Sequence, residues 1–427
     1  MKQNKPVPEL RFKEFNDEWV SKPLRDVITL TTRPLKMKDE QSYSLVTIKR
    51  RYEGVVHRGD FKGKEIKVKS QFLLEENDFV ISKRQISHNA CGLVPKELAG
   101  SIVSNEYSVF VPQKNTHIDY FNYFCHLPKV SKTFYLSSIG VHIEKMLFKV
   151  DVWLKRKFYF PSLPEQQKIA SFLSAIDEKI RQLTRKKELL EQYKKGVMQQ
   201  LFPPPGEHAP KLRFKDENGK DYPEWVDKLY GDVFSFYPTN SFSRENLNYE
   251  SGIVKNIHYG DIHTKFSTLF NIKNERVPYV NKEISISNIK KDSYCQEGDL
   301  VIADASEDYA DIGKAIELVE LDDERVIAGL HTFLARPNKL GMHKGFSGQL
   351  VKASFVHRQM MTIAQGTKVL SLSSGRLSRV KLKIPCIAEQ QKIATYISIV
   401  DAKINTVALQ ITQTQTFKKG LLQQMFV

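Results

Sequence analysis

Residues 161–202 read PSLPEQQKIASFLSAIDEKIRQLTRKKELLEQYKKGVMQQLF, and residues 385–426 read PCIAEQQKIATYISIVDAKINTVALQITQTQTFKKGLLQQMF. The two stretches align without a gap, because adding 224 to a position in the first gives its partner in the second, as for Glu165 and Glu389. In each copy apolar residues recur every seven positions, a spacing that predicts a helix packed against another helix. Since both copies carry this stripe, we expect the two helices to be each other's partners.

The stripe contains mostly large aliphatic residues: Ile169, Ile176, Leu183, Leu190 and Val197 in the first copy, and Ile393, Val400, Val407, Thr414 and Leu421 in the second. At 1.5 Å per residue, either helix would be about 55 to 60 Å long. Ser162, followed three residues later by Glu165, predicts a capping box at the start of the first helix.

A second repeat extends the duplication beyond the helices. Residues 11–27, RFKEFNDEWVSKPLRDV, return as RFKDENGKDYPEWVDKLYGDV at residues 213–233. Each half therefore consists of an entry segment, a globular region of mixed strands and loops, and a long helix. Strand signals lie at residues 43–48, 78–82, 108–112, 299–303 and 325–335. Because the globular regions match poorly outside short echoes, we expect two different specificities on one repeated frame.

The composition favours a polyanionic partner. The 427 residues are enough for two or three domains, and 65 Lys and Arg against 49 Asp and Glu give a net charge of +16. Aromatic and apolar residues are spread among the basic ones, which favours nucleic acid over a membrane surface. Four scattered cysteines without a C-x-x-C pair predict buried thiols in a reducing compartment. Without a signal peptide or a bilayer-length apolar run, we expect a soluble, cytoplasmic protein.

Motifs of several enzyme classes are missing. The sequence contains neither a G-x-x-x-x-G-K-[ST] phosphate loop nor a G-x-G-x-x-G turn, an amino-methyltransferase motif or a G-x-S-x-G elbow. Asp60, Glu65 and Lys67 superficially suggest a nuclease, although the segment reads better as a solvated basic hairpin. His258 and His263 are potential metal ligands or simply loop histidines. The sequence thus predicts a chain without its own catalytic, metal or cofactor site.

The duplicated motifs occur in a fixed order: L-R-F-K before a Trp near the start of each half, then EQQKIA, then KKG-x-x-QQ-x-F near each helix end. This set resembles the specificity subunit of type I restriction-modification enzymes, and the resemblance covers essentially the whole chain. It implies an α+β fold in which two mixed α/β target-recognition domains are joined by two long antiparallel coiled-coil helices with internal pseudo-twofold symmetry. The expected segments are a first recognition domain at 1–160, a central spacer helix at 161–202, a Pro-rich linker at 203–210, a second recognition domain at 211–384 and a distal spacer helix at 385–427.

The resemblance also implies a function. Such a subunit is noncatalytic, recognises a split double-stranded DNA target, and places two methyltransferase subunits, and in the full enzyme two restriction subunits, on the DNA. S-adenosylmethionine, ATP and Mg would then belong to those partners, with no cofactor bound by this chain. The alternative from another class is a basic coiled-coil DNA-binding adaptor or repressor that acts without a modification partner.

Candidate DNA-binding residues come from loops at the ends of predicted strands, because Arg and Lys read guanine, Asn and Gln read adenine, and any well-placed cation holds phosphate. In the first half they are Lys49, Arg50, Arg51, Lys83, Arg84, Gln85, His88, Asn89, Ser138 and His142. In the second half they are Lys255, Asn256, His258, Tyr259, Asp304, Ser306, Gln365, Thr367 and Lys368. For each loop, an exposed polar turn without a ligand is the competing interpretation.

Two helix surfaces are further candidates. The identical helix starts predict scaffold or partner contacts by Glu165, Gln166, Gln167, Lys168, Glu389, Gln390, Gln391 and Lys392. In mid-course the first helix alone carries the basic run Arg181, Arg185, Lys186 and Lys187. That run is either a solvated helix face or a track for DNA phosphates.

Overall fold

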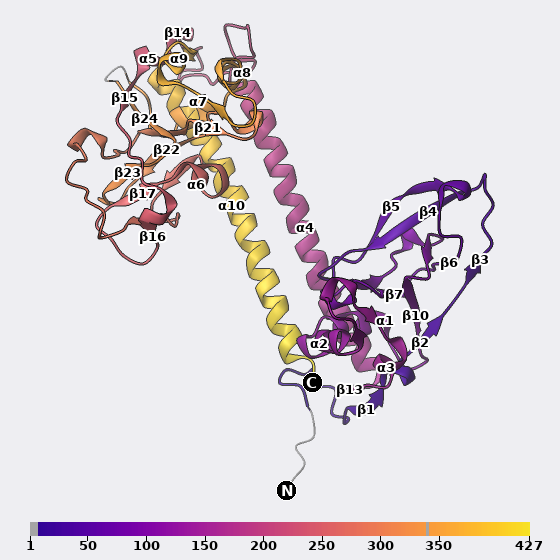
Figure 1. Ribbon diagram of the computed structural model, residues 1–427. Coiled ribbons are helices and arrows are strands. Elements are labelled where there is room, and N and C mark those ends of the chain that lie inside the picture. The colour runs from indigo at the N-terminus through magenta and orange to yellow at the C-terminus, as the bar shows by residue number, and fades with distance from the viewer. Residues whose placement is uncertain (1–6, 339–340) are drawn as a thin grey trace. The chain divides into compact units, whose positions relative to one another are not determined.

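The computed structural model describes residues 7–338 and 341–427 and divides into two compact units. Of the described residues, unit 1 comprises 7–184 and 409–427, and unit 2 comprises 185–338 and 341–408. Two long helices stand out, α4 (Leu163–Leu201, 39 residues) and α10 (Ile387–Gln424, 38 residues), and each contributes one part to either unit (Figure 1). The expected α+β class with two long helices is confirmed. The units, however, divide the chain within these helices rather than at their ends.

The described residues of unit 1 form two larger sheets, two two-stranded sheets and three short α-helices besides the long ones. One sheet has the order β2 (Ile28–Thr31), β10 (Tyr107–Pro112), β7 (Phe79–Ser82), β8 (Cys91–Leu93), with antiparallel neighbours throughout. The other has the order β3 (Pro34–Leu35), β6 (Gln71–Leu73), β9 (Ile102–Ser104), β4 (Ser42–Ile48), β5 (Val55–Lys62). Two small pairs join β1 (Val20–Pro23) to β13 (Lys157–Phe160) and β11 (Ser138–Ile139) to β12 (Leu147–Phe148). The helices are α1 (Ile118–Cys125), α2 (Pro128–Leu136) and α3 (Val150–Leu154).

Unit 2 repeats this frame with additions. Its main sheet has the order β15 (Phe234–Tyr237), β24 (Thr332–Pro337), β20 (Leu300–Ala303), β22 (Ala315–Glu320), β18 (Leu269–Asn271). A second sheet contains β16 (Leu247–Asn248), β19 (Tyr279–Val280), β17 (Lys255–Ile257), β23 (Val326–Ala328). The pairs are β14 (Val226–Leu229) with β26 (Lys381–Ile384) and β21 (Ala305–Ser306) with β25 (Leu370–Ser371). Its short helices are α5 (Tyr230–Val233), α6 (Tyr259–Thr264), α7 (Ser347–Lys352), α8 (Ser354–Ile363) and α9 (Ser374–Leu377).

The four-stranded sheet of unit 1 and the main sheet of unit 2 have equivalent strands in the same order, since β2-β10-β7-β8 corresponds to β15-β24-β20-β22. A buried aspartate precedes the third strand in both: Asp78 accepts a hydrogen bond from the Glu75 amide, and Asp299 accepts one from the Gln296 amide, each at 2.8 Å. Each carboxylate also pairs with an arginine, Arg33 or Arg336. The predicted strand signals therefore fall on strands, and the duplication includes the sheets as well as the helices.

Each unit buries the end of one long helix in its core. In unit 1, Phe426 stacks on Tyr120 with ring centroids 5.1 Å apart. In unit 2, the corresponding Phe202 stacks on Phe346 at 5.8 Å. Such aromatic contacts between distant segments are worth about 0.5–1.5 kcal/mol beyond the area they bury. The repeated motif at the helix ends thus anchors each helix in a globular core.

The long helices pair in opposite directions within each unit. In unit 1, Lys418 Nζ near the end of α10 lies 2.6 Å from Asp177 Oδ1 near the start of α4. In unit 2, the corresponding Lys194 Nζ of α4 lies 2.6 Å from Asp401 Oδ1 of α10. The heptad stripe forms the least exposed line of both helices. The pairing predicted from the repeat, and the antiparallel direction that the resemblance implies, are therefore confirmed in both units.

Candidate nucleic-acid and partner surfaces

Three of the predicted loops meet in unit 1. Arg50, after β4, donates from Nε to Gln85 Oε1 (2.8 Å) and from Nη2 to Glu144 Oε2 (2.9 Å). His88 Nε2 lies 3.1 Å from the other oxygen of Glu144. These side chains come from the β4–β5 turn, the loop after β7 and the β11–β12 hairpin. Segments as far as 94 residues apart in sequence therefore form one polar surface.

Backbone conformation holds this surface in place. The backbone φ angles of Arg51, Tyr52 and Asn89 are 58°, 60° and 61°, in the left-handed region that residues other than glycine adopt uncommonly. The Arg51 amide donates to the His88 carbonyl (2.8 Å), and the Tyr52 amide donates to the Asn89 carbonyl (3.0 Å). These bonds compensate for the strained turns, so the two loops are fixed against each other.

The other predicted residues of unit 1 differ in availability. Lys49, Arg51 and His142 are exposed. Lys83 donates to the Asn105 carbonyl (2.6 Å), and Arg84 donates to Glu106 (2.7 Å) at an exposed position. By contrast, two short side chains are bonded within the domain: Asn89 accepts from Ser131 Oγ, and Ser138 Oγ donates to the Phe134 carbonyl. The latter two thus support the loops, whereas the cations line the surface.

In unit 2 the corresponding loops also converge. The Leu372 amide donates to the Asp304 carbonyl (2.8 Å), and the Asp304 amide donates to the His331 carbonyl (3.1 Å). Asp304 Oδ1 also lies 3.3 Å from His331 Nδ1, and burial raises the pKa of this aspartate. Residues 304–306 and 365–371 are therefore neighbours, joined by the β21–β25 pair. His331 was missed by the sequence reading, because a lone histidine before a strand carries no distinguishing pattern.

Tyr259 extends the same surface. Its ring lies edge-on to His331 at 5.4 Å and to His263 at 6.3 Å between ring centroids. Neighbouring His258 is mostly buried, and this burial lowers the pKa of its imidazole, whose Nδ1 accepts from the Gly260 amide at the start of α6. His258 thus caps a helix, while Tyr259 lies among the loop residues.

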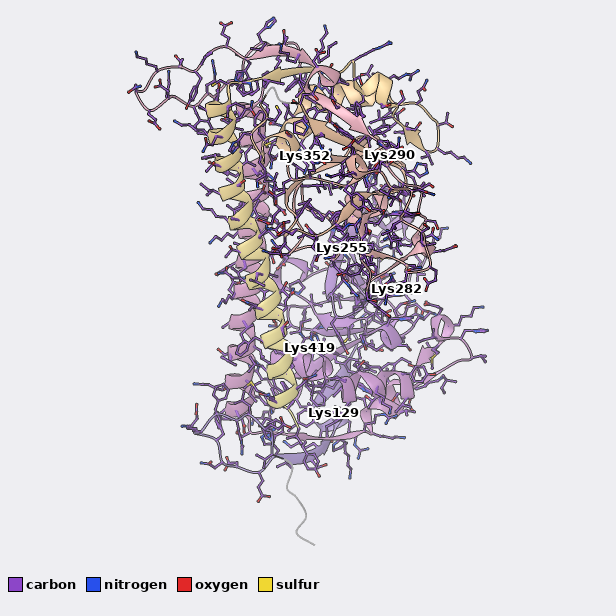
Figure 2. All side chains as sticks on the ribbon, turned by 90° about the vertical axis from the view of Figure 1, so that its left-hand side faces the viewer. Lys129, Lys255, Lys282, Lys290, Lys352 and Lys419 are labelled. Atoms are coloured by element: carbon purple, nitrogen blue, oxygen red, sulfur yellow. The ribbon has the colours of Figure 1, made fainter. Side chains whose placement is uncertain are left out.

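Asn256 corrects one of the surface assignments. It is completely buried and accepts a hydrogen bond from Asn240 Nδ2 at 2.7 Å. Ser306 is also buried and donates from Oγ to the Asp308 carbonyl at 2.8 Å. Lys255, which is labelled in Figure 2, donates to Glu324 at 2.8 Å. In the second half the strand-end residues are therefore partly committed to the interior, because two β-strands flank β17.

The EQQKIA helix starts bind the entry segment of their own unit. In unit 1, Glu165 accepts from Arg11 Nε (2.8 Å), Arg11 Nη2 (2.7 Å) and Trp19 Nε1 (3.4 Å). In unit 2, Glu389 accepts from Arg213 Nε (3.0 Å) and Nη2 (2.6 Å). Both carboxylates are 1% or less exposed. Instead of closing a capping box as expected, Glu165 forms a buried bidentate ion pair, the geometry in which arginine binds carboxylate most strongly.

The following glutamine is equally committed. Gln166 accepts from the His117 amide (2.9 Å) and donates to the Pro161 carbonyl (3.0 Å). Gln390 accepts from the His343 amide (2.8 Å) and donates to the Pro385 carbonyl (2.9 Å). These contacts favour a scaffold role for the Glu and first Gln of each motif. The outer residues Gln167, Lys168, Gln391 and Lys392 remain at least partly exposed, so partner contact through them stays a prediction.

Comparison with known proteins agrees with this duplicated arrangement. The family model described as the type I restriction modification DNA specificity domain matches residues 16–192 and 223–414, so it covers both halves. The chain belongs to this family. Each half of the chain therefore carries a type I restriction modification DNA specificity domain.

Relatives of this specificity subunit are distant in sequence. It is 23% identical to the type I restriction enzyme MjaVIII specificity subunit of Methanocaldococcus jannaschii, over 66% of this chain and 62% of the relative's length. Its fold matches the S subunit of a type I restriction-modification system from M. genitalium with a TM-score of 0.56 and 13% identity, covering 99% of both chains. A structure that addresses complex assembly and conformational transition of the type I R-M system matches with a TM-score of 0.56 and 16% identity, covering 96% of this chain and 97% of the other.

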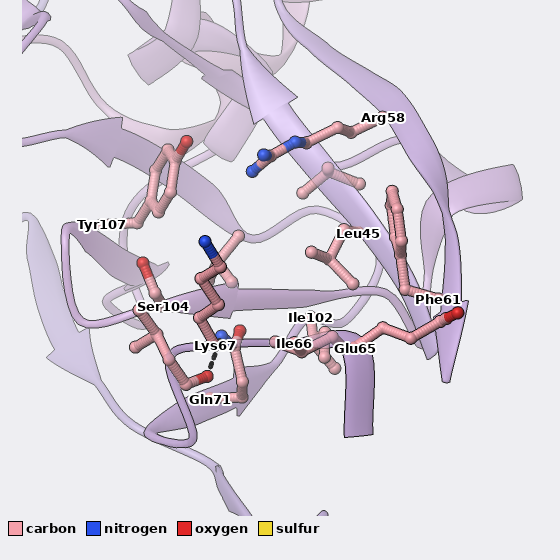
Figure 3. A pocket seen from close by; sticks show the side chains of 13 residues that line it. Leu45, Arg58, Phe61, Glu65, Ile66, Lys67, Gln71, Ile102, Ser104 and Tyr107 are labelled. Carbon is pink, nitrogen blue, oxygen red and sulfur yellow. Dashed lines mark hydrogen bonds between the residues drawn. The ribbon is translucent and has the colours of Figure 1, made fainter. Parts of the chain in front are cut away.

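The specificity subunit has a cavity of about 380 Å³ in unit 1, between β4, β5 and β9. Figure 3 shows Arg58, Lys67 and Tyr107 around it, together with Glu65 from the nuclease alternative. Asp60 is not among the lining residues and instead lies 3.2 Å from His57 Nε2. Across residues 7–338 and 341–427, no three His, Cys, Asp or Glu side chains are grouped so that they could hold a metal ion.

The basic run in the middle of α4 lies on an exposed face. Arg181 pairs with Glu178, Arg185 with Glu188 at 3.2 Å, and Lys187 with Glu191 at 2.9 Å, all within the helix. Such i,i+3 and i,i+4 pairs are typical of a solvated helix surface.

In the described part of this chain, no helix is long and apolar enough to cross a membrane.

Proposed function

We propose that this chain is the noncatalytic DNA-recognition subunit of a type I restriction-modification enzyme, that it binds a bipartite DNA target, and that it positions two methyltransferase subunits on it. In the full enzyme two restriction subunits would join them. S-adenosylmethionine, ATP and Mg would be bound by those partners. The observation that carries the proposal is one frame present twice, on which the helix starts and sheets repeat while the loops differ.

The polar loops of each unit support DNA readout. Both units bring loops from distant parts of the chain together at the ends of equivalent strands, β7 and β20. Unit 1 presents mainly cations there, whereas unit 2 presents Asp304, Tyr259 and His331. Aspartate can accept from the amino group of cytosine, and arginine can donate to guanine. The two half-sites would accordingly differ in base sequence.

A repeated surface patch of exposed and half-buried residues supports two copies of one partner. Its members are apolar residues and a helical glycine at corresponding positions of the repeat: Leu10, Phe12, Phe172, Phe417 and Gly420 in unit 1, and Leu212, Phe214, Tyr396, Tyr193 and Gly196 in unit 2. Phe12 lies 5.8 Å from Phe172, and Phe214 lies 5.8 Å from Tyr396, between ring centroids. In unit 2 the patch surrounds a cavity of about 290 Å³. We call each set a glycine patch.

The two glycines are the most informative members. Glycine inside a helix costs about 1 kcal/mol relative to alanine. Among the described residues, nothing lies within 4 Å of a Cβ built on Gly196 or Gly420, so packing within the chain does not require them. A helical glycine beside exposed aromatic rings is explained if a second polypeptide approaches the helix closely there. Because the patch occurs once in each unit, one kind of partner would bind twice.

The test of the function is co-expression with the methyltransferase subunit encoded beside this chain, followed by single-molecule mapping of modified bases. A split motif with one modified base in each half, absent without this chain, is the expected result. If both proteins are soluble and associated but no new modification appears, the adaptor or repressor reading replaces this one.

The glycine patches predict stoichiometry. Gly196→Leu and Gly420→Leu each fill open space on the isolated chain but obstruct one patch, so native mass spectrometry should show loss of one methyltransferase copy in each single variant and of both in the double variant. Asn405→Leu, which adds the same side chain at another exposed position of α10, is the control and should retain both copies. Two bound copies in the double variant would contradict the patch assignment.

A further inference from the structure

The β11–β12 hairpin of unit 1 carries apolar side chains at an exposed tip. Ile139, Val141 and Ile143 are 63%, 95% and 44% exposed. All three lie within five consecutive residues, where scattered surface hydrophobics would be further apart. Contiguous exposed apolar side chains are typical of surfaces that contact something else. The tip is therefore a candidate contact that the polar loop residues do not account for.

The hairpin is pinned to the loops that carry the predicted DNA-binding residues. The Phe148 amide donates to the Lys83 carbonyl at 3.0 Å, and Glu144 pairs with Arg50 and His88. At its bend, a Cβ on Gly140, whose φ is +156°, would lie 2.9 Å from the Cα of Met146. Glycine thus allows the two arms to approach closely, and the tip projects from a fixed base.

The surroundings of the tip are cationic. Glu144 is already paired with Arg50, and Glu106 with Arg84. Two further cations near this loop, Arg51 and Lys145, are exposed. An apolar tip with a cationic rim fits a polyanion that displays an apolar group. In the major groove of DNA that group is the 5-methyl of thymine.

Unit 2 has a tight turn in the corresponding place with a different tip. It follows α8 as the unit 1 hairpin follows α2. Gly366, with φ +124°, occupies the bend, where a Cβ would lie 1.9 Å from the Val369 carbonyl oxygen. Its tip contains Thr367 and Lys368, both exposed, followed by Val369, which is 53% exposed. The bend is therefore retained, and the tip carries one exposed apolar residue beside polar ones where unit 1 has three, as expected of an element that reads different bases in the two half-sites.

We propose that the hairpin tip of unit 1 is a specificity-determining element and that Val141, flanked by Ile139 and Ile143, recognises the 5-methyl group of a thymine in the DNA half-site bound by this unit. The inference rests on the proposed function. It names a base that this half-site must contain and the side chain that contacts it.

The experiment uses the complete subunit assembled with its methyltransferase and a duplex carrying the mapped target. Each thymine of the target is replaced in turn by deoxyuridine, which removes only the methyl group, and the dissociation constant is measured by fluorescence anisotropy. One replacement should weaken binding about fourfold, the factor that corresponds to about 0.8 kcal/mol for one methyl-sized group. Val141→Ala should weaken binding to the thymine duplex similarly and remove the difference between the thymine and deoxyuridine duplexes. Leu30→Ala, at another exposed apolar position of unit 1, should preserve that difference.

Several results would overturn the inference. A target whose deoxyuridine variants all bind like the parent, or whose sensitive thymine responds identically in wild type and Val141→Ala, excludes this methyl contact. Weaker binding by Val141→Ala without any deoxyuridine effect would identify the tip as a wedge or a protein contact instead. If the assembled complex methylates DNA without sequence preference, both the proposed function and this inference fail. If site-specific methylation is intact but the deoxyuridine and Val141→Ala results are negative, only this inference is rejected.

Discussion

Removal of the arginine from each helix-start ion pair should destabilise the two units unequally. Arg11→Met and Arg213→Met leave Glu165 or Glu389, both about 1% exposed or less, without their bidentate partner. Breaking such a buried pair on one side costs about 3–5 kcal/mol. Both variants also lose a hydrogen bond from Nη2 to a backbone carbonyl, at Asp17 (2.6 Å) or Pro223 (2.7 Å), so the two perturbations are matched in this respect.

The difference between the units comes from a tryptophan. Trp19 Nε1 still donates to Glu165, at 3.4 Å, after Arg11 is removed. The corresponding Trp225 Nε1 is buried and has no partner among the described residues. A long hydrogen bond to a charged group is worth about 1 kcal/mol. Arg213→Met should therefore destabilise unit 2 by about 1 kcal/mol more than Arg11→Met destabilises unit 1.

Hydrogen exchange with mass spectrometry across a urea series measures each unit separately, through amides of β10 in unit 1 and β24 in unit 2. The control Arg25→Met, at an exposed pair with Asp26, should change unit 1 by less than about 0.5 kcal/mol. Arg213→Met combined with Glu389→Met should be less destabilised than Arg213→Met alone, because no buried charge is left unpaired. A loss below about 1 kcal/mol for Arg213→Met, or a larger loss for Arg11→Met, would refute the reasoning.

Three further predictions concern single groups. Burial raises the pKa of Glu317 to about 7 from an ordinary 4.5. A carboxyl group whose pKa is raised in the folded state stabilises the fold at low pH. The free energy of unfolding of unit 2 should therefore fall by up to about 3 kcal/mol as the pH rises from 4.5 through 7. Glu317→Gln should flatten that profile in urea titrations, and parallel profiles would contradict the assignment. Burial also raises the thiol pKa of Cys91, Cys125 and Cys295, whereas Cys386 is partly exposed. One thiol per chain should therefore react rapidly with a disulfide reagent at pH 8, and no thiol should do so in Cys386→Ser. Finally, Lys194→Glu should increase amide exchange in the first half of α10, because it places a second negative charge beside Asp401 at a cost of about 1 kcal/mol. Adding Asp401→Lys to Lys194→Glu should reverse this increase. Unchanged exchange in Lys194→Glu would show that this pair contributes nothing.

The sequence alone determined the duplicated frame. A gapless offset of 224 residues and a seven-residue apolar period are local, repeated signals, so they gave both long helices, their mutual pairing and the family resemblance. The strand signals likewise fell on β4, β7, β10 and β20; β7 and β20 are short apolar runs in which every residue is buried, and such continuous runs predict buried strands. The correspondence between the loops after β7 and β20 also followed from the repeat, since equivalent strand ends belong to equivalent places.

Tertiary structure decided which of those residues are available. The sequence around Glu165 is compatible with a capping box and with a buried ion pair. The ion pair forms because Arg11, 154 positions away, contacts the carboxylate in the folded chain. Asn256 reads as a strand-end polar residue, yet the strands on both sides of β17 enclose it. His331 carries no local pattern, and the loop around Val141 was chosen from the sequence for its polar residues Ser138 and His142, not for its exposed apolar tip. Burial and partner choice depend on contacts between distant segments, and periodicity within one segment does not contain that information.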